Sequence, residues 1–309
     1  MPKQGHADEV PFAPKSIRVP VDFSERSLAG FKAAKHLARR FHSKVTLLFV
    51  DEWTPAELDQ DLGRGANRDL LRRYDENTRA RLEALAGGHP GTTTKVIEGG
   101  AKEELRRLTR EGLFDCVVMG THGHGGLWRF LLGSVAHSTL YASEIPVLTV
   151  HAAPPAPWPE RILIPVKFTR HSDVALRCAL SLAEAFRAKA SLLHVLKNGD
   201  SAFDDSHALM EHCESLLGAE RMARLGWAIE SGDPAATILK VAERDRFDLI
   251  VLAAHRKTFW KGFHLGMTAE RVLLHSDVPV LSIPTDTRIE DRESSFLLRG
   301  IRKAHEAIG

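Results

Sequence analysis

Short apolar runs alternate along the chain with longer segments in which charged residues recur at helical spacing. The run at 45–50 is almost entirely apolar, which is typical of a strand covered on both faces. Alternating strands and helices predict a parallel sheet with helices on both faces, joined by right-handed crossovers. In the first half, the predicted strands are 17–21, 45–50, 94–98, 115–119 and 146–150, and the predicted helices are 27–41, 68–85, 102–111 and 133–141.

The second half of the chain repeats this pattern. Residues 17–50 align without a gap with residues 162–195, and 13 of those 34 positions are identical. A second block, 99–150, aligns with 232–284. The repeat therefore predicts two tandem copies of one α/β domain, each a doubly wound five-stranded parallel sheet.

The duplication also predicts how the two copies meet. They can face each other as an intrachain pseudo-dimer, with strands 146–150 and 279–283 at the contact, because sheet edges need cover. Whether the whole chain forms a further homodimer stays open. The predicted division is a flexible tail at 1–14, a first domain at 15–151, a Pro- and Ala-rich linker at 152–160, a second domain at 161–285 and a helical extension at 286–309.

Composition narrows the class of protein. Hydrophobic residues make up 43% of the chain and charged residues 27%, which permits a core in each half. The formal net charge of +2 is too small to indicate a nucleic-acid partner or a membrane-surface field. Three cysteines are too few for a disulfide framework, and the N-terminus lacks the apolar core of a secretory signal. No run reaches the ~20 apolar residues of a membrane span, so we expect a cytoplasmic protein.

The loop after Met119 carries the candidate chemistry. In a doubly wound sheet, ligands bind beyond the carboxyl ends of the strands. Gly120 and Gly123 let the main chain approach a ligand closely, and Gly133 with Ser134 opens a helix whose free N–H groups suit a phosphate. The alternative is a glycine-rich connector in which the Gly-Ser pair only caps a helix.

The spacing Gly120-x2-Gly123-x9-Gly133-Ser134 resembles the ATP-binding motif of the universal stress proteins. Val-Pro-Val-Asp-Phe-Ser at 19–24, Val-Met-Gly-Thr-His-Gly at 118–123 and Pro-Val-Leu at 146–148 resemble that family too. The resemblance covers both repeats. It implies a Rossmann-like fold of the adenine-nucleotide α-hydrolase type and ATP bound to the first copy, with Mg²⁺ able to bridge the phosphates.

The resemblance also implies a role for individual residues. Asp22 would accept hydrogen bonds from the nucleoside, although an Asx-type turn residue at the start of the helix is the alternative. Pro20 and Val21 would line the base pocket, and the backbone of Val50 would meet the adenine. The full implied binding site is Pro20, Val21, Asp22, Val50, Met119, Gly120, Gly123, His124, Gly133, Ser134 and Val135.

The second copy departs from the motif. Lys167 stands in place of Asp22, Ala253 in place of Gly120, Arg256 in place of Gly123, and Met267 in place of Ser134. The hypothesis is that the C-terminal copy does not bind ATP in the family manner and serves as a structural partner.

The sequence leaves three candidate functions. The first is a stress-response regulatory protein controlled by its nucleotide and acting on an unknown protein partner. The second is a slow ATPase or another ATP-using enzyme, but the chain has no His-x-Gly-His, Ser-Gly-Gly-x-Asp-Ser or Gly-x4-Gly-Lys-(Ser/Thr) element, so no catalytic residue is assigned. The third is a non-binding interaction scaffold. His122 and His124 suggest a metal site with His255 or His264, but no supporting carboxylate is specified, and no metal ligand is predicted.

Overall fold

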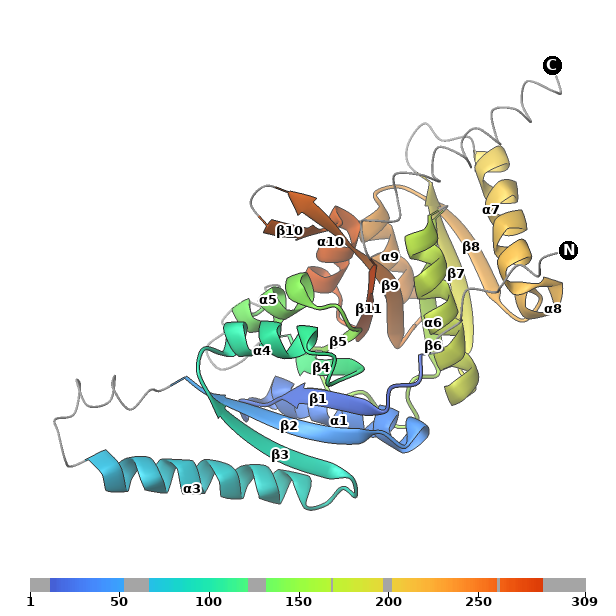
Figure 1. Cartoon of the computed structure of the whole chain (residues 1–309). Helices are drawn as coiled ribbons and strands as arrows, with labels where there is room; N and C mark the ends of the chain where they lie inside the picture. The colour runs from blue at the N-terminus through green and yellow to red at the C-terminus, as the bar shows by residue number, and fades with distance from the viewer. Residues whose placement is uncertain are drawn as a thin grey trace, which may run out of the picture.

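A computed structural model of the chain describes residues 12–52, 67–121, 132–167, 169–196, 202–259 and 262–285. One continuous sheet runs through both halves in the order β3-β2-β1-β4-β5-β11-β9-β6-β7-β8, with β10 paired to β9 alone. Helices cover both faces of this sheet (Figure 1). The predicted α/β class and the twofold arrangement of doubly wound units are confirmed.

Every strand and helix predicted in the first half is present, with ends within two residues of the prediction. The described elements of the first copy are β1 (Ser16–Pro20), α1 (Glu25–Phe41), β2 (Lys44–Asp51), α3 (Asn67–Ala86), β3 (Thr92–Glu98), α4 (Ala101–Arg110), β4 (Cys116–Gly120), α5 (Ser134–Ala142) and β5 (Val147–Val150). Those of the second copy are β6 (Arg161–Pro165), α6 (Arg170–Phe186), β7 (Lys189–Leu196), α7 (Ala202–Leu217), α8 (Ala219–Met222), β8 (Gly226–Ser231), α9 (Pro234–Arg244), β9 (Leu249–Phe259), β10 (Gly262–Leu265), α10 (Met267–His275) and β11 (Val280–Thr285).

The two copies join along β5 and β11, the one antiparallel pair in the main run of strands. Leu148 pairs with Leu281, and the hydroxyls of Thr149 and Ser282 donate across the junction to the carbonyls of Val280 and Val147 at 3.2 and 3.0 Å. The predicted contact between these strands is therefore confirmed, and it merges two five-stranded sheets into one.

One predicted strand end in the second copy is wrong. The alignment of 99–150 with 232–284 predicts that the strand equivalent to 115–119 ends at Leu252, but it continues as β9 to Phe259 and folds back into β10, with Phe259 paired to Gly262. The first copy has Gly120 and Gly123 in this stretch, whereas the second has Ala253 and Arg256. Ala253 and Arg256 have a Cβ and are followed by Thr258 and Phe259, so this stretch favours a continued strand, whereas glycine disfavours one.

Two apolar layers hold the helices on the sheet. One buried cluster packs α1, α3, α6 and α7 against one face, and two others pack α4, α5, α9 and α10 against the opposite face. Both faces of the strands are thus buried, as the nearly continuous apolar runs predicted. No helix in these described ranges is long and apolar enough to cross a bilayer.

A charged residue interrupts the core in β1. Arg18 is 3% exposed, and its guanidinium lies over the ring of Phe114 at 3.6 Å from the centroid. Its Nε and Nη1 have no hydrogen-bond partner among the described residues. Burial lowers the pKa of Arg18 to about 10, with a smaller opposing contribution from Glu111. The aligned residue of the second copy is Leu163, which is also buried.

A histidine–aspartate contact ties α7 to α6 in the second copy. His212 Nε2 lies 2.9 Å from Asp173 Oδ1, and this hydrogen bond raises the pKa of His212 against the opposing effect of burial. A histidine whose pKa is raised in the folded state contributes its full stabilisation below its unfolded-state pKa of about 6.5. That contribution is lost as the pH rises through its folded-state pKa.

We therefore expect the stability difference between the parent and His212→Gln to be largest near pH 6 and to shrink toward pH 8. Urea unfolding across that pH range measures the difference. His207→Gln is the matched control, because His207 lies exposed on the same helix. Identical pH profiles for His212→Gln and the parent would contradict the assignment.

Candidate functional site

A cavity of about 450 Å³ lies at the carboxyl ends of β1, β2 and β4, beside the first turns of α4 and α5. This volume is within the range of small-molecule sites, which is about 300–1,000 Å³. Doubly wound folds bind their ligands at this end of the sheet, beyond the carboxyl ends of the strands. The cavity is lined by Pro20, Val21, Asp22, Ser27, Leu48, Val50, Glu52, Ala101, Leu105, Met119, Gly120, Thr121, Gly133, Ser134, Val135 and Ala136.

The structure brings nine of the eleven predicted site residues to this one cavity. The remaining two, Gly123 and His124, lie outside the described residues. Sequence reasoning missed seven lining residues: Ser27, Leu48, Glu52, Ala101, Leu105, Thr121 and Ala136. Thr121 lies inside the motif at 118–123 and Ala136 follows Val135 directly, so the sequence could have indicated both. The residues of α4 reach the cavity only because the folded chain packs that helix beside it.

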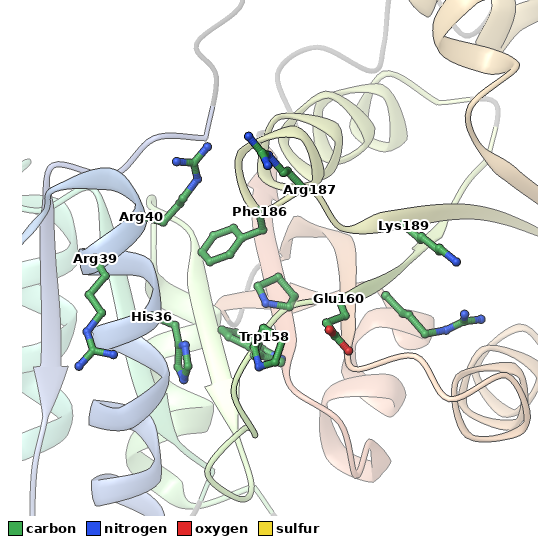
Figure 2. Close-up of a pocket in the computed structure, with 11 residues that line it drawn as sticks. His36, Arg39, Arg40, Trp158, Glu160, Phe186, Arg187 and Lys189 are labelled. Carbon is green, nitrogen blue, oxygen red and sulfur yellow. The ribbon is translucent and has the colours of Figure 1, made fainter.

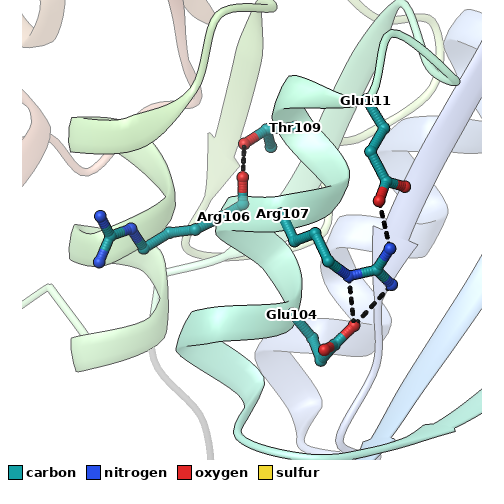
Figure 3. Close-up of polar contacts among 5 residues, drawn as sticks. All are labelled: Glu104, Arg106, Arg107, Thr109 and Glu111. Carbon is teal, nitrogen blue, oxygen red and sulfur yellow. Dashed lines mark hydrogen bonds and ion pairs between the residues drawn. The ribbon is translucent and has the colours of Figure 1, made fainter.

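The α4 wall is held mainly by apolar burial. Leu105 and Leu108 form a small buried cluster with Leu48 of β2. On the outer face, Arg107 contacts Glu104 at 2.8 Å and also Glu111 (Figure 3). Exposed ion pairs of this kind contribute about 0–1 kcal/mol, so the buried leucines position the wall.

The turn after β1 holds Asp22 at the cavity. Asp22 Oδ1 accepts hydrogen bonds from the backbone N–H and the hydroxyl of Ser24 at 3.0 and 2.6 Å. Ser24 in turn caps α1 by accepting from the backbone N–H of Ser27. Phe23 between them has a φ of +63°, an uncommon conformation for a bulky residue. The Asx-type turn is therefore present, but Ser24 is the helix cap and Asp22 still faces the cavity.

Gly120 has a packing reason to be glycine that is independent of any ligand. A Cβ at this position would lie 2.7 Å from the backbone carbonyl of Arg26 in α1 and 2.9 Å from the Ser27 nitrogen. Gly30 of α1 approaches the same point, and its Cβ would lie 3.2 Å from the Gly120 nitrogen. The missing side chains thus let α1 approach β4 closely.

We expect Gly120→Ala to lower the free energy of unfolding by about 1–3 kcal/mol, because the methyl group would push α1 away from the end of β4. Denaturant unfolding measures the loss. Gly88→Ala is the control, since no atom lies within 4 Å of a Cβ there. An unchanged midpoint for Gly120→Ala would show that α1 can move without cost.

The N-terminus of α5 faces the cavity without a side-chain cap. Gly133 is the N-cap residue, and its own N–H donates to the Thr121 carbonyl at 2.6 Å. Ser134, Val135 and Ala136 form the first turn and line the cavity. First-turn N–H groups have no partner within the helix, and the helix dipole places about half a positive charge there. This turn is therefore suited to an anionic group.

The equivalent edge of the second copy is built differently. The turn itself is kept, because the Lys167 N–H donates to Ser172 Oγ at 2.9 Å as the Asp22 N–H does to Ser27 Oγ at 3.4 Å. Met267, in place of Ser134, is 81% exposed. The β9–β10 hairpin occupies the stretch that aligns with the glycine-rich sequence at 120–126 in the first copy.

The histidines do not form a metal site in the described structure. His171 and His255 lie with ring centroids 4.1 Å apart at the second copy's turn. His122, His124 and the side chain of His264 lie outside the described residues. Among the side chains that are described, no three His, Cys, Asp or Glu residues gather in a way that could hold a metal ion.

Comparison with known proteins finds the same family in both halves of the chain. The family profile described as "Universal stress protein family" matches residues 14–151 and again 159–284. A universal stress protein of Mycolicibacterium smegmatis is 29% identical over 292 residues, covering 86% of this chain and 96% of that protein. One from Methanocaldococcus jannaschii is 30% identical over 138 residues, covering 44% of this chain and 81% of that protein.

A solved structure shares the whole architecture. The crystal structure of a universal stress protein from Archaeoglobus fulgidus DSM 4304 superposes with a TM-score of 0.70 and covers 87% of this chain and 98% of its own. At 23% sequence identity, this likeness concerns the fold alone.

Proposed function

The chain belongs to the universal stress protein family, and from that premise we propose that the cavity of its N-terminal copy binds an adenine nucleotide, with ATP as the preferred ligand. The observation that carries the proposal is the convergence, on one cavity, of an uncapped helix start, a carboxylate and apolar side chains. Cavities that bind small ligands combine apolar walls with a few placed polar groups in this way.

Each part of the cavity suits one part of the nucleotide. Val21, Leu48 and Met119 provide an apolar surface for the adenine ring. Asp22 provides a carboxylate for ribose hydroxyl groups. The first turn of α5, with the Ser134 hydroxyl, provides donors for the phosphates. The first turn has no acidic residue to repel an anion.

Mg²⁺ fits the same arrangement as a bridge between phosphates. It needs few protein ligands when phosphate oxygens and water supply the rest. Asp22 and Glu52 are the acidic residues of the cavity lining. When bound, the ion would neutralise phosphate charge beside the first turn of α5.

We assign the nucleotide a regulatory role in the stress response. Ligand binding to the folded state adds RT ln(1 + [L]/Kd), about 2.7 kcal/mol when the ligand is 100-fold above Kd. Nucleotide occupancy would thus change the stability of the first copy and the surface it presents. The second copy is proposed to be a structural partner without a nucleotide.

Isothermal titration calorimetry of the full chain with ATP and Mg²⁺ tests the proposal. The expected result is saturation at one nucleotide per chain. Saturation at two equivalent sites would contradict the proposed asymmetry between the copies.

A non-binding scaffold is the second candidate, and the packing of Gly120 against α1 favours it, because that glycine has a structural role without a ligand. It predicts no heat with ATP, ADP or AMP in the same titration. Mass spectrometry of protein purified under mild conditions, without added ligand, provides a separate measurement, since the scaffold would retain no nucleotide.

A further inference from the structure

A second cavity, of about 820 Å³, lies where the two copies meet, far from the proposed nucleotide site. It is bounded by the last turns of α1 and α6, the linker at 157–160, and the first residues of β6 and β7 (Figure 2). These are the amino ends of the strands, whereas the first cavity lies at carboxyl ends. We call it the basic cleft.

The basic cleft carries an excess of positive charge. One carboxylate, Glu160, lines it together with five cationic side chains. None of the five forms an ion pair with a carboxylate in the described part of the chain, and the Nε of one, Arg161, is buried there without a hydrogen-bond partner. The cations are Arg39, Arg40, Arg161, Arg187 and Lys189.

The helix ends account for part of this charge. Cations are favoured at helix C-termini, where the dipole is equivalent to about half a negative charge. Two helices end at the cleft, and Arg40 Nε donates to the Ala185 carbonyl in the last turn of α6. The two helix ends, Glu160 and the Asp248 carboxylate beneath the linker together offset about three of the five positive charges, so an excess of positive charge remains.

The cations are spread around the cleft and do not converge on one point. Arg39 and Lys189 lie on opposite sides, while Arg40 and Arg187 lie along one edge (Figure 2). Arg39, Arg40, Arg187 and Lys189 are all exposed. A small anion could contact only some of them, whereas an extended chain bearing several negative charges could reach along the whole rim.

Hydrogen bonds and ring packing hold the floor of the cleft. Trp158 is 2% exposed, and its indole N–H donates to the Asp248 carbonyl at 2.8 Å. The Asp248 carboxylate accepts the backbone N–H groups of Glu160 and Arg161 at 2.8 and 3.0 Å, which holds the linker in place. Phe186 packs edge-on against Phe41. A floor ordered in advance reduces the entropy lost on binding.

We propose that the basic cleft docks an extended acidic segment of a partner protein. Arginine guanidinium groups bind carboxylates through paired, charge-assisted hydrogen bonds, and arginine clusters are a recurrent means of recognising acidic motifs. The cleft and the nucleotide cavity lie at opposite ends of their strands, so both can be occupied together.

Fluorescence anisotropy of a labelled hexaglutamate peptide with the full chain tests this. Saturable binding at 50 mM salt is expected, weakening at 150 mM because the rim charges are exposed. Arg39→Gln/Arg187→Gln should bind about three- to tenfold more weakly than the parent. The matched control is Arg79→Gln/Arg271→Gln, which removes two exposed arginines away from the cleft and should bind as the parent does.

Several results would overturn the proposal. They are absence of saturable binding at 50 mM salt, equal affinity of the cleft variant and the parent, or an equal loss in the control variant. Binding of tripolyphosphate or a DNA duplex without binding of hexaglutamate would assign the cleft to another class of anion. ATP calorimetry on the same variants separates this outcome from failure of the nucleotide proposal.

Discussion

Replacing Arg18 by leucine is expected to raise the free energy of unfolding by about 1–3 kcal/mol, because a buried charge without full hydrogen bonding costs more than an apolar side chain of similar reach. The lowering of the Arg18 pKa to about 10 corresponds to about 3 kcal/mol against the charged form. Loss of the contact with Phe114 removes about 0.5–2 kcal/mol. The second copy already has leucine here.

Guanidinium chloride unfolding of Arg18→Leu and the parent measures this gain. The gain should be constant between pH 6 and pH 8, because a folded pKa of about 10 leaves Arg18 charged over that whole range. Arg106→Leu on the exposed face of α4 is the control and should change stability by less than about 0.5 kcal/mol. A less stable Arg18→Leu protein would show that the buried charge is compensated.

Replacing Asp22 by alanine is expected to weaken ATP binding by about tenfold to a hundredfold. A hydrogen bond to a charged group contributes about 1.5–3 kcal/mol, and each 1.4 kcal/mol is a factor of ten in affinity. The turn should survive, because the second copy keeps the equivalent backbone contact with Lys167 and no carboxylate. Calorimetry with ATP measures the change.

Two further variants separate the role of Asp22 in the turn from its role toward the ligand. Asp22→Asn keeps an Oδ1 acceptor for Ser24 and removes the charge. Asp75→Ala removes an exposed carboxylate on α3 and should leave affinity unchanged. If Asp22→Ala binds ATP as tightly as the parent, Asp22 is a turn residue alone.

The repeat in the sequence was sufficient to predict most of the fold. The two aligned blocks imply the same strand order in each half, and the antiparallel pairing of β5 with β11 follows from two equivalent edges that each need a partner. The extension of β9 was missed because it depends on residues that replace the glycines of the first copy. Local strand preference there outweighed the family pattern.

The candidate site was predictable only where a short sequence motif specifies the local structure. The main-chain turn at Asp22 and the helix start at Gly133 are local features, and both lie at the cavity. The α4 wall was not predictable, because Leu105 reaches the cavity only after α4 packs on β2. The spacing of Gly120 could not distinguish close approach of a ligand from close approach of α1, since either forbids a Cβ.

The shared sheet has a consequence for fragments of this protein. Val147, Leu148 and Val150 of β5 are at most 1% exposed because β11 and the flanking helices cover them. A chain cut within the linker would turn β5 into an open, apolar edge strand, the kind that pairs with whatever strand it meets. Such a fragment should self-associate through β5, so solution studies of the N-terminal half alone would report on an assembly made through an edge that β11 covers in the intact chain.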